Sequence, residues 1–251
     1  MRVASRVEYD GTHYWGWQLQ PDALMTVQGQ IEAALSKLYH VRIPVMASGR
    51  TDAGVHALNQ CIHFDIPDAR IKIESLPKAL NSMLPKDIVM LAAQRVEADF
   101  HARFSAMHRS YVYHIFTCPT ALYRNTVWQT QKVLDFDLLK QGAIPILGIH
   151  DFSSFCSSKT DTKNMMCNIT TSEWIQTEDG FDYHIAGNRF LHHMVRLLVG
   201  CMIEISRHKL SIDKIKHFLD NPDKQSNVVK AAATGLVLKT VEYPESMNLK
   251  I

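Results

Sequence analysis

Segments in which apolar and polar side chains alternate recur along this chain, and segments with helical periodicity separate them. Residues 2–9 alternate with a period of two and end at Asp10-Gly11, which predicts a strand that runs into a turn. Thr26 is a predicted N-cap, and a helix follows it because apolar residues recur at three- and four-residue steps, at Val27, Ile31, Leu35 and Leu38. A chain of this kind buries one face of a sheet against helices.

The alternation of strands and helices continues along the chain. Strands are predicted at 88–96, 111–116, 170–175, 181–186 and 236–243, and the Asp179-Gly180 turn joins two of them in a hairpin. Helices are predicted at 76–84, from Asp135 to Pro145, at 190–206 and at 211–219. We therefore expect an α+β fold. The polar and basic stretch 99–110 is the candidate boundary, which gives an N-terminal subdomain at 1–105 and a C-terminal subdomain at 106–251.

Composition excludes few functions. The chain has 251 residues, 46% of them hydrophobic, and a net charge of +2, which permits a polyanionic partner without demanding one. Its five cysteines include no C-x-x-C pair, which argues against a disulfide framework and fits a reducing cytoplasm. Charged residues interrupt the first ten positions, so we expect no signal peptide, and the apolar runs are too short to cross a bilayer.

The segment SGRTDAGVHALNQ, residues 48–60, sets Arg50 and Asp52 on either side of one threonine between Gly49 and Gly54. In one interpretation, Asp52 is the N-cap of a short helix and pairs with Arg50 at the surface, where such pairs contribute about 0–1 kcal/mol. In the other, the glycines let the backbone turn tightly against a ligand, and neighbouring cations keep one carboxylate ionised in a cleft. Such an anion can act as a nucleophile or a base.

A single carboxylate in this setting limits the chemistry. Most glycoside hydrolases need two carboxylates, and no second acid lies in a comparable glycine-framed segment. The sequence also lacks a G-x-x-x-x-G-K-[ST] phosphate loop, a G-x-G-x-x-G fingerprint and an H-E-x-x-H metal helix. His56, Cys61 and His63 do not have the spacing of a closed zinc site. We predict neither a metal nor an organic cofactor.

Two further segments combine aromatic and basic side chains, and each has a structural alternative. GTHYWGWQLQ, residues 11–20, offers rings that stack on unpaired bases or fill the core. HARFSAMHRSYVY contains Arg103 and Arg109 directly before the strand of Tyr111 and Tyr113. It is either an edge that contacts phosphates or a solvated connector.

The segment NRFLHHMVR gives the most apolar predicted helix one basic face. Arg189, His193 and Arg196 fall at i, i+4 and i+7 of this segment. A cation on an otherwise buried helix costs desolvation unless an anion meets it, so Arg196 requires a carboxylate or phosphate partner. Asp52 is the candidate for that partner.

Together these segments resemble the tRNA pseudouridine synthases of type A, which isomerise uridine in the anticodon arm. The resemblance covers nearly the whole chain and rests on YDGTHYWGWQLQ, SGRTDAGVHA, FHARFSA followed by RSYVY, HDFSSF, FLHHMVRLLVG and GLVL. It implies a pseudouridine synthase fold with a mixed, mostly antiparallel central sheet flanked by helices and two similar subdomains. It also implies a homodimer that binds the anticodon arm of tRNA without a metal or cofactor.

The resemblance assigns roles residue by residue. The catalytic aspartate corresponds to Asp52, the active-site tyrosine to Tyr111, and the arginine that pairs with the aspartate to Arg196. Arg50 corresponds to a basic residue that flips or holds the nucleotide. We add a contribution to RNA binding from Arg103, Arg109, Arg189 and His193. The chain departs from the family pattern at Lys230 to Ala233, where a Thr-Ala-Pro run is common, and at Ser206, where a glycine is usual.

The implied reaction converts uridine to pseudouridine at tRNA positions 38–40 in the anticodon stem-loop. It breaks the bond from N1 to the ribose, turns the uracil and joins C5 to C1′, so it needs one anion and no redox partner. Whether Asp52 attacks C1′, attacks C6 or removes a ribose proton is open at this point. The alternatives are a pseudouridine synthase with a shifted RNA target and a noncatalytic RNA-binding protein; a nucleosidase would lack its acid partner.

Overall fold

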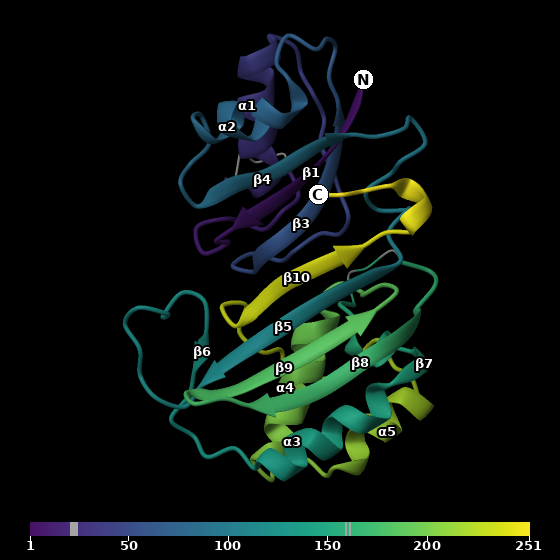
Figure 1. Cartoon of the computed structure of the whole chain (residues 1–251). Coiled ribbons are helices and arrows are strands. Elements are labelled where there is room, and N and C mark those ends of the chain that lie inside the picture. The colour runs from purple at the N-terminus through teal and green to yellow at the C-terminus, as the bar shows by residue number, and fades with distance from the viewer. Residues whose placement is uncertain (21–24, 159, 161) are drawn as a thin grey trace. The chain divides into compact units, whose positions relative to one another are not determined.

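The protein is described by a computed structural model that covers residues 1–20, 25–158, 160 and 162–251. The chain divides into two compact units (Figure 1). The first unit holds residues Met1–Arg109 and Val237–Ile251, and the second holds Ser110–Leu236. The last strand therefore belongs to the first unit. The predicted subdomains, 1–105 and 106–251, place that strand in the C-terminal one. The assignment of site residues to those subdomains stays a prediction.

The first unit contains a mixed sheet. Its strands are ordered β4-β1-β3-β10, with bounds Ile88–Arg95, Arg2–Tyr9, His56–Asp65 and Leu236–Glu242, and β2 (Met46–Ala47) pairs with β3. Strand β1 pairs antiparallel with both β3 and β4, whereas β10 runs parallel to β3. The predicted strands at 2–9, 88–96 and 236–243 are confirmed.

The helices of the first unit are α1 (Val27–Tyr39) and α2 (Leu76–Asn81). Thr26 caps α1 as expected, because its side chain accepts a hydrogen bond from the backbone N–H of Gly29 at 3.2 Å. Val27, Ile31 and Leu35 of α1 are fully buried. A 3₁₀ turn (Ile73–Ser75) leads into α2, which ends earlier than the predicted 84.

The second unit repeats the combination of strands and helices. Its strands are ordered β5-β9-β8-β7, with bounds His108–Phe116, Gly180–Gly187, Met166–Gln176 and Gly148–Asp151, and β6 (Trp128–Gln129) pairs with β5. Strands β8 and β9 form the predicted hairpin about Asp179-Gly180. Its α-helices are α3 (Phe136–Ala143), α4 (Met194–Ser206) and α5 (Asp213–Asp220). The predicted helices from Asp135 and at 211–219 are confirmed.

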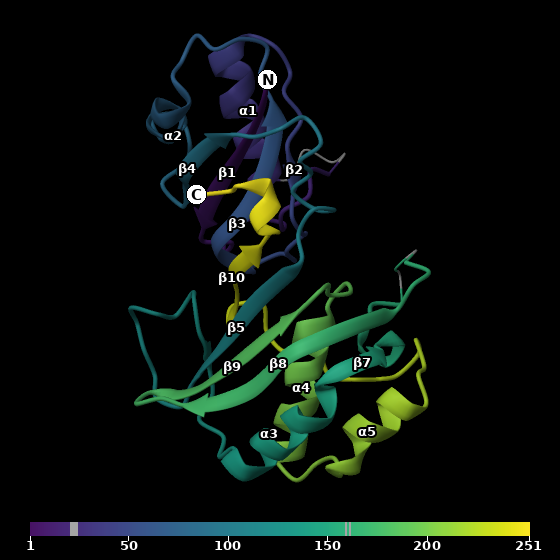
Figure 2. The same ribbon diagram turned by 45° about the vertical axis from the view of Figure 1, so that its right-hand side comes forward.

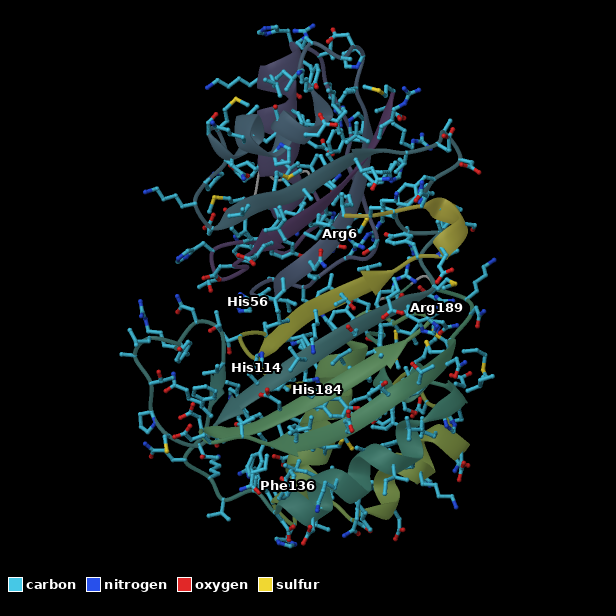
Figure 3. The ribbon with its side chains drawn as sticks, viewed as in Figure 1. Arg6, His56, His114, Phe136, His184 and Arg189 are labelled. Carbon is cyan, nitrogen blue, oxygen red and sulfur yellow. The ribbon has the colours of Figure 1, made fainter. Side chains whose placement is uncertain are left out.

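The helices α3, α4 and α5 cover one face of the sheet of the second unit (Figures 1 and 2). Side chains of β8 on this face contact the helices. Ser172 donates a hydrogen bond to the carbonyl of Ala143 in α3 at 2.8 Å. The indole N–H of Trp174 donates to the sulfur of Met202 in α4 at 3.2 Å. His114 and His184 lie on the opposite, helix-free face in Figure 3. There His114 Nδ1 and Asp182 Oδ1 are 2.7 Å apart.

The expected helix at 190–206 begins only at Met194. His193 has φ 68°, a left-handed conformation that a right-handed helix cannot include. Consequently Arg189 and His193 do not share a helix face with Arg196, and the predicted basic helix face is wrong. Only Arg196 belongs to α4.

The two units together give an α+β fold with mixed, mostly antiparallel strand pairing, as the sequence predicted. Within the part of the chain that the structure describes, no helix is long and apolar enough to cross a membrane.

Gly200 fixes the distance between α4 and the segment that follows α5. A Cβ atom built at Gly200 would lie 1.9 Å from the carbonyl oxygen of Val229 and 3.0 Å from the backbone nitrogen of Ala231. Both obstacles are main-chain atoms, so the close approach requires a residue without a side chain.

We predict that Gly200→Ala lowers the free energy of unfolding by about 2 kcal/mol or more, because the segment at 229–231 must move away from α4. Urea unfolding followed by circular dichroism measures this loss. Gly142→Ala in α3 is the matched control, since the nearest atoms to its Cβ would be side-chain atoms, of Met202 at 3.2 Å and of Ile215 at 3.4 Å. Equal stabilities for the two variants would contradict this account of Gly200.

Candidate active site

The loop that carries Asp52 is a turn between β2 and β3 and not the start of a helix. The backbone N–H of Val55 donates to the carbonyl of Asp52 at 3.1 Å, and β3 begins directly after it. Gly54 has φ 75°, a conformation that favours glycine. The interpretation of Asp52 as a helix N-cap is therefore excluded. The Asp52 side chain is half-buried, whereas Arg50 is exposed.

The YDGT segment and its continuation pack directly against this loop. The hydroxyls of Tyr9 and Thr51 are 2.8 Å apart, and the backbone N–H of Trp17 donates to the carbonyl of Thr51 at 3.0 Å. A Cβ at Gly11 would lie 2.0 Å from the Val55 oxygen, and one at Gly16 would lie 2.7 Å from the Thr51 oxygen. These two glycines thus allow one backbone to lie on the other.

Gln60 on β3 supports the loop from the other side. Its side-chain amide N–H donates to the carbonyl of Gly49 at 2.9 Å, and its oxygen accepts a hydrogen bond from the Ser48 hydroxyl at 2.5 Å. Gln60 is 0% exposed. The sequence analysis missed this residue, although a polar side chain at an inward-facing strand position is a signal that could have identified it.

Arg109 is buried, with 9% of its surface exposed. One guanidinium nitrogen donates to the carbonyl of Ala106 at 3.0 Å, and the other donates to the carbonyls of Ser48 at 3.1 Å and Arg103 at 2.6 Å. One side chain therefore joins the start of the Asp52 loop to the segment that precedes β5. This geometry fits a structural clamp better than the phosphate contact that we expected from Arg109.

The aromatic residues after YDGT divide into two groups. Tyr14 and Trp17 are buried and fill the core of the first unit, whereas Trp15 is 58% exposed. The interpretation of this segment as core packing therefore holds for Tyr14 and Trp17.

In the second unit, Tyr111 lies on β5 and is 9% exposed. Its ring meets that of Phe190 edge to face, with centroids 5.1 Å apart. Arg196, in the first turns of α4, is half-buried and its Nε donates to the carbonyl of Ala231 at 2.9 Å. The backbone N–H of Ala231 returns a bond to the carbonyl of Arg196 at 3.0 Å.

The predicted site residues fall into two sets. The first unit holds Arg50, Asp52, Arg103 and Arg109, and the second holds Tyr111, Arg189, His193 and Arg196. Arg103 is exposed, and Arg189, labelled in Figure 3, is half-exposed together with His193. Neither unit, taken by itself over the described residues, gathers three histidine, cysteine or acidic side chains at a spacing that could hold a metal ion.

Comparison with known proteins identifies the family to which this chain belongs. The sequence model described as tRNA pseudouridine synthase matches residues 6–105 and 143–244. Proteins named tRNA pseudouridine synthase A are similar over nearly their full length. That of Chlorobium luteolum is 40% identical over 99% of this chain and 98% of the relative, and that of Bacillus pumilus is 40% identical over 97% of this chain and 99% of the relative. That of Bacillus subtilis is 38% identical over the same shares.

This chain is therefore an RNA-modifying isomerase by class. It belongs to the tRNA pseudouridine synthase family.

Arg109→Lys is predicted to lower the free energy of unfolding by about 2 kcal/mol, because one ammonium group cannot reach three carbonyls and leaves buried acceptors without donors. Chemical unfolding measures the change. Arg124→Lys, at an exposed arginine that donates to the carbonyl of Ala121, is the matched control and should unfold like the wild type. A wild-type stability for Arg109→Lys would show that the clamp contributes nothing.

A buried histidine also supports the segment before β5. His63 Nδ1 accepts a hydrogen bond from the backbone N–H of Ala102 at 3.1 Å, which only the neutral ring can do. Burial, with smaller contributions from His101 and Arg2, lowers the pKa of His63 from the ordinary 6.5 to about 4. Because the unfolded chain takes up this proton first, the stability that His63 contributes is complete above about pH 6.5 and is lost as the pH falls toward 4.

We expect His63→Asn to reduce the acid-induced loss of stability between pH 7 and pH 4, since the amide oxygen can still accept from Ala102 and does not titrate in this range. Unfolding free energies measured across this range give the comparison with wild type. His13→Asn, at an exposed histidine, controls for the removal of one ring. Parallel pH curves for wild type and His63→Asn would refute the prediction.

Proposed function

We propose that this protein converts uridine to pseudouridine in the anticodon stem-loop of tRNA, at positions 38–40, with Asp52 as the nucleophile and without a cofactor. The proposal rests on one observation above all. In a chain of the tRNA pseudouridine synthase family, a half-buried carboxylate lies in a turn that Thr51, Gln60 and Arg109 tie down. A carboxylate fixed in this way loses little freedom when it attacks, which favours a step that needs one anion.

The other residues have supporting roles in this proposal. Arg196 pairs with the catalytic carboxylate. Tyr111 packs on the uracil and contributes to removal of the C5 proton. Its buried ring, held edge to face by Phe190, supports a packing role. Arg50, exposed and two residues from Asp52, takes the place of the flipped nucleotide or contacts its phosphate.

The proposed partners follow from the substrate. The anticodon arm of tRNA is a polyanion, and Arg103, Arg189 and His193 are exposed or half-exposed cationic or titratable side chains that can contact it. We propose that the protein acts in the cytoplasm, where tRNA is modified, and that it functions as a homodimer. A pseudouridine synthase with a different RNA target is the second candidate, because the site chemistry does not depend on which stem presents the uridine.

Asp52→Asn tests the proposal. We expect this variant to lose at least about a thousandfold of the rate of isomerisation while it binds tRNA within about threefold of wild type, because the amide keeps the shape and loses the nucleophile. Unmodified tRNA is incubated with each protein, and pseudouridine is mapped by carbodiimide labelling and primer extension. Asp68→Asn is the control, since this exposed carboxylate pairs with Arg70 at 2.7 Å.

The mapped positions decide between the candidates. A signal on the 3′ side of the anticodon arm with wild type and Asp68→Asn, and none with Asp52→Asn, supports activity and nucleophile together. A signal elsewhere in RNA supports the shifted target. Binding of tRNA without any pseudouridine would support a noncatalytic RNA-binding protein, and release of free uracil a nucleosidase.

A further inference from the structure

The segment Phe100–Ala106, which lies between β4 and β5 in Figure 1, has no regular secondary structure, yet the backbone N–H groups of Phe100 to Ser105 all donate hydrogen bonds. The N–H of Ala102 donates to His63, and those of Arg103 and Phe104 both donate to His101 Nδ1 at 3.1 and 3.3 Å. The N–H of Phe100 donates to the carbonyl of Glu97, and that of Ser105 donates to the carbonyl of His101. The N–H of His101 donates to the Ser105 hydroxyl.

Side chains from elsewhere in the first unit hold the carbonyls of the same segment. Arg2 donates to the carbonyl of Phe100 at 3.1 Å, and the Tyr243 hydroxyl donates to that of Ala102 at 2.6 Å. Arg109 holds the carbonyls of Arg103 and Ala106. A loop held by this many side chains has one conformation, so its outward side chains are presented rigidly.

The two side chains at the tip of the loop point outward. Phe104 is 76% exposed, and Arg103 is exposed as well. The guanidinium of Arg103 lies 5.6 Å from the centroid of the Phe104 ring. The centroids of the His101 and Phe104 rings are 4.4 Å apart, and the two ring planes are tilted by 35°. Within the part of the chain that the structure describes, no carboxylate pairs with Arg103.

Single exposed apolar side chains are common and need no function. This one differs because the loop that carries it is fixed by Arg2, His63, Arg109 and Tyr243 while the ring itself stays outside the core. A flat apolar face beside a cation without an anionic partner suits a ligand that has both a π-face and a negative charge. Nucleic acids have both in every nucleotide.

We propose that Phe104 is a base-stacking platform for an unpaired base of the tRNA substrate, with Arg103 on the adjacent phosphate and Arg109 as the positioning residue that holds the platform. This inference rests on the proposed function for the identity of the RNA. It extends that function from the reacting uridine to a second point of contact, carried by a residue that the sequence analysis did not single out.

Two properties distinguish stacking from a general electrostatic attraction. Loss of the Phe104 ring weakens binding by roughly tenfold and leaves the dependence of affinity on salt unchanged, because the ring carries no charge. Loss of the Arg103 charge, as in Arg103→Gln, reduces the slope of log affinity against log salt by about one. A loop with only a structural role would show neither effect.

The first experiment measures the Kd of unmodified tRNA by fluorescence anisotropy with full-length protein. All proteins carry Asp52→Asn, so that no turnover changes the RNA. Phe104→Ala and Phe104→Leu are expected to bind roughly tenfold more weakly, whereas Phe104→Tyr keeps the ring and binds within about twofold of its parent. Leu91→Ala, at a 47% exposed leucine on β4, is the control for loss of exposed apolar area. Thermal melts confirm that each variant is folded.

The second experiment places the probe at the platform. Phe104→Trp adds an indole whose fluorescence is quenched when a base stacks on it, and Leu91→Trp is the matched control for the added tryptophan. Quenching on addition of tRNA at position 104 alone supports the platform. An unchanged Trp emission at position 104, or tRNA affinities of Phe104→Ala and Phe104→Leu equal to that of Leu91→Ala, overturns it.

These measurements separate the platform from the proposed activity. If the protein that retains Asp52 makes no pseudouridine while Phe104→Trp is quenched by tRNA, the proposed function fails and the platform stands. If pseudouridine forms while the Phe104 variants bind tRNA like their parent, the platform fails and the proposed function stands.

Discussion

The loop that carries Asp52 has no secondary structure of its own, so its order depends on side chains that satisfy its backbone. Gln60 holds the carbonyl of Gly49, and Arg109 holds that of Ser48. Because a buried carbonyl without a donor costs free energy, these bonds favour the conformation of the loop that satisfies both carbonyls. The same arginine also holds the segment before β5, so one buried cation joins two loops of the first unit.

Most of the secondary structure could be predicted from the sequence because local rules determine it. The period of two identified β1, and Thr26 marked the start of α1. The start of α4 could not be found in this way, since residues 190–193 fit a helical pattern and only the left-handed φ of His193 interrupts it. The pairing of β10 with the first unit could not be predicted from local rules either, because β10 runs parallel to β3, a strand far away in sequence.

In the candidate site, the position of Asp52 in a tight turn could be predicted from the glycines around it. Asp52 stands out because glycines frame it, and Gly54 does adopt the left-handed conformation that only a glycine adopts readily. The phosphate contact of Arg109 stays a prediction, whereas the bonds of its guanidinium to three carbonyls could not be foreseen, because a sequence shows a charge and not its burial. Gln60 was missed since its partners, the Ser48 hydroxyl and the carbonyl of Gly49, lie eleven or twelve positions away and meet it only after the chain folds back.

In the segment Lys230 to Ala233 the chain departs from the family pattern. The segment is held through its own main-chain carbonyls. The carbonyl of Ala231 accepts from Arg196, and that of Ala232 accepts from the Tyr113 hydroxyl at 3.0 Å. Neither bond uses the side chains that differ. Alanine in place of proline gives the unfolded chain more freedom, at a cost of about 0.4–1 kcal/mol in stability. Because Arg196 Nε donates to a main-chain carbonyl of this segment, the orientation of Arg196 depends on the path of the backbone and not on which side chains stand at 230–233.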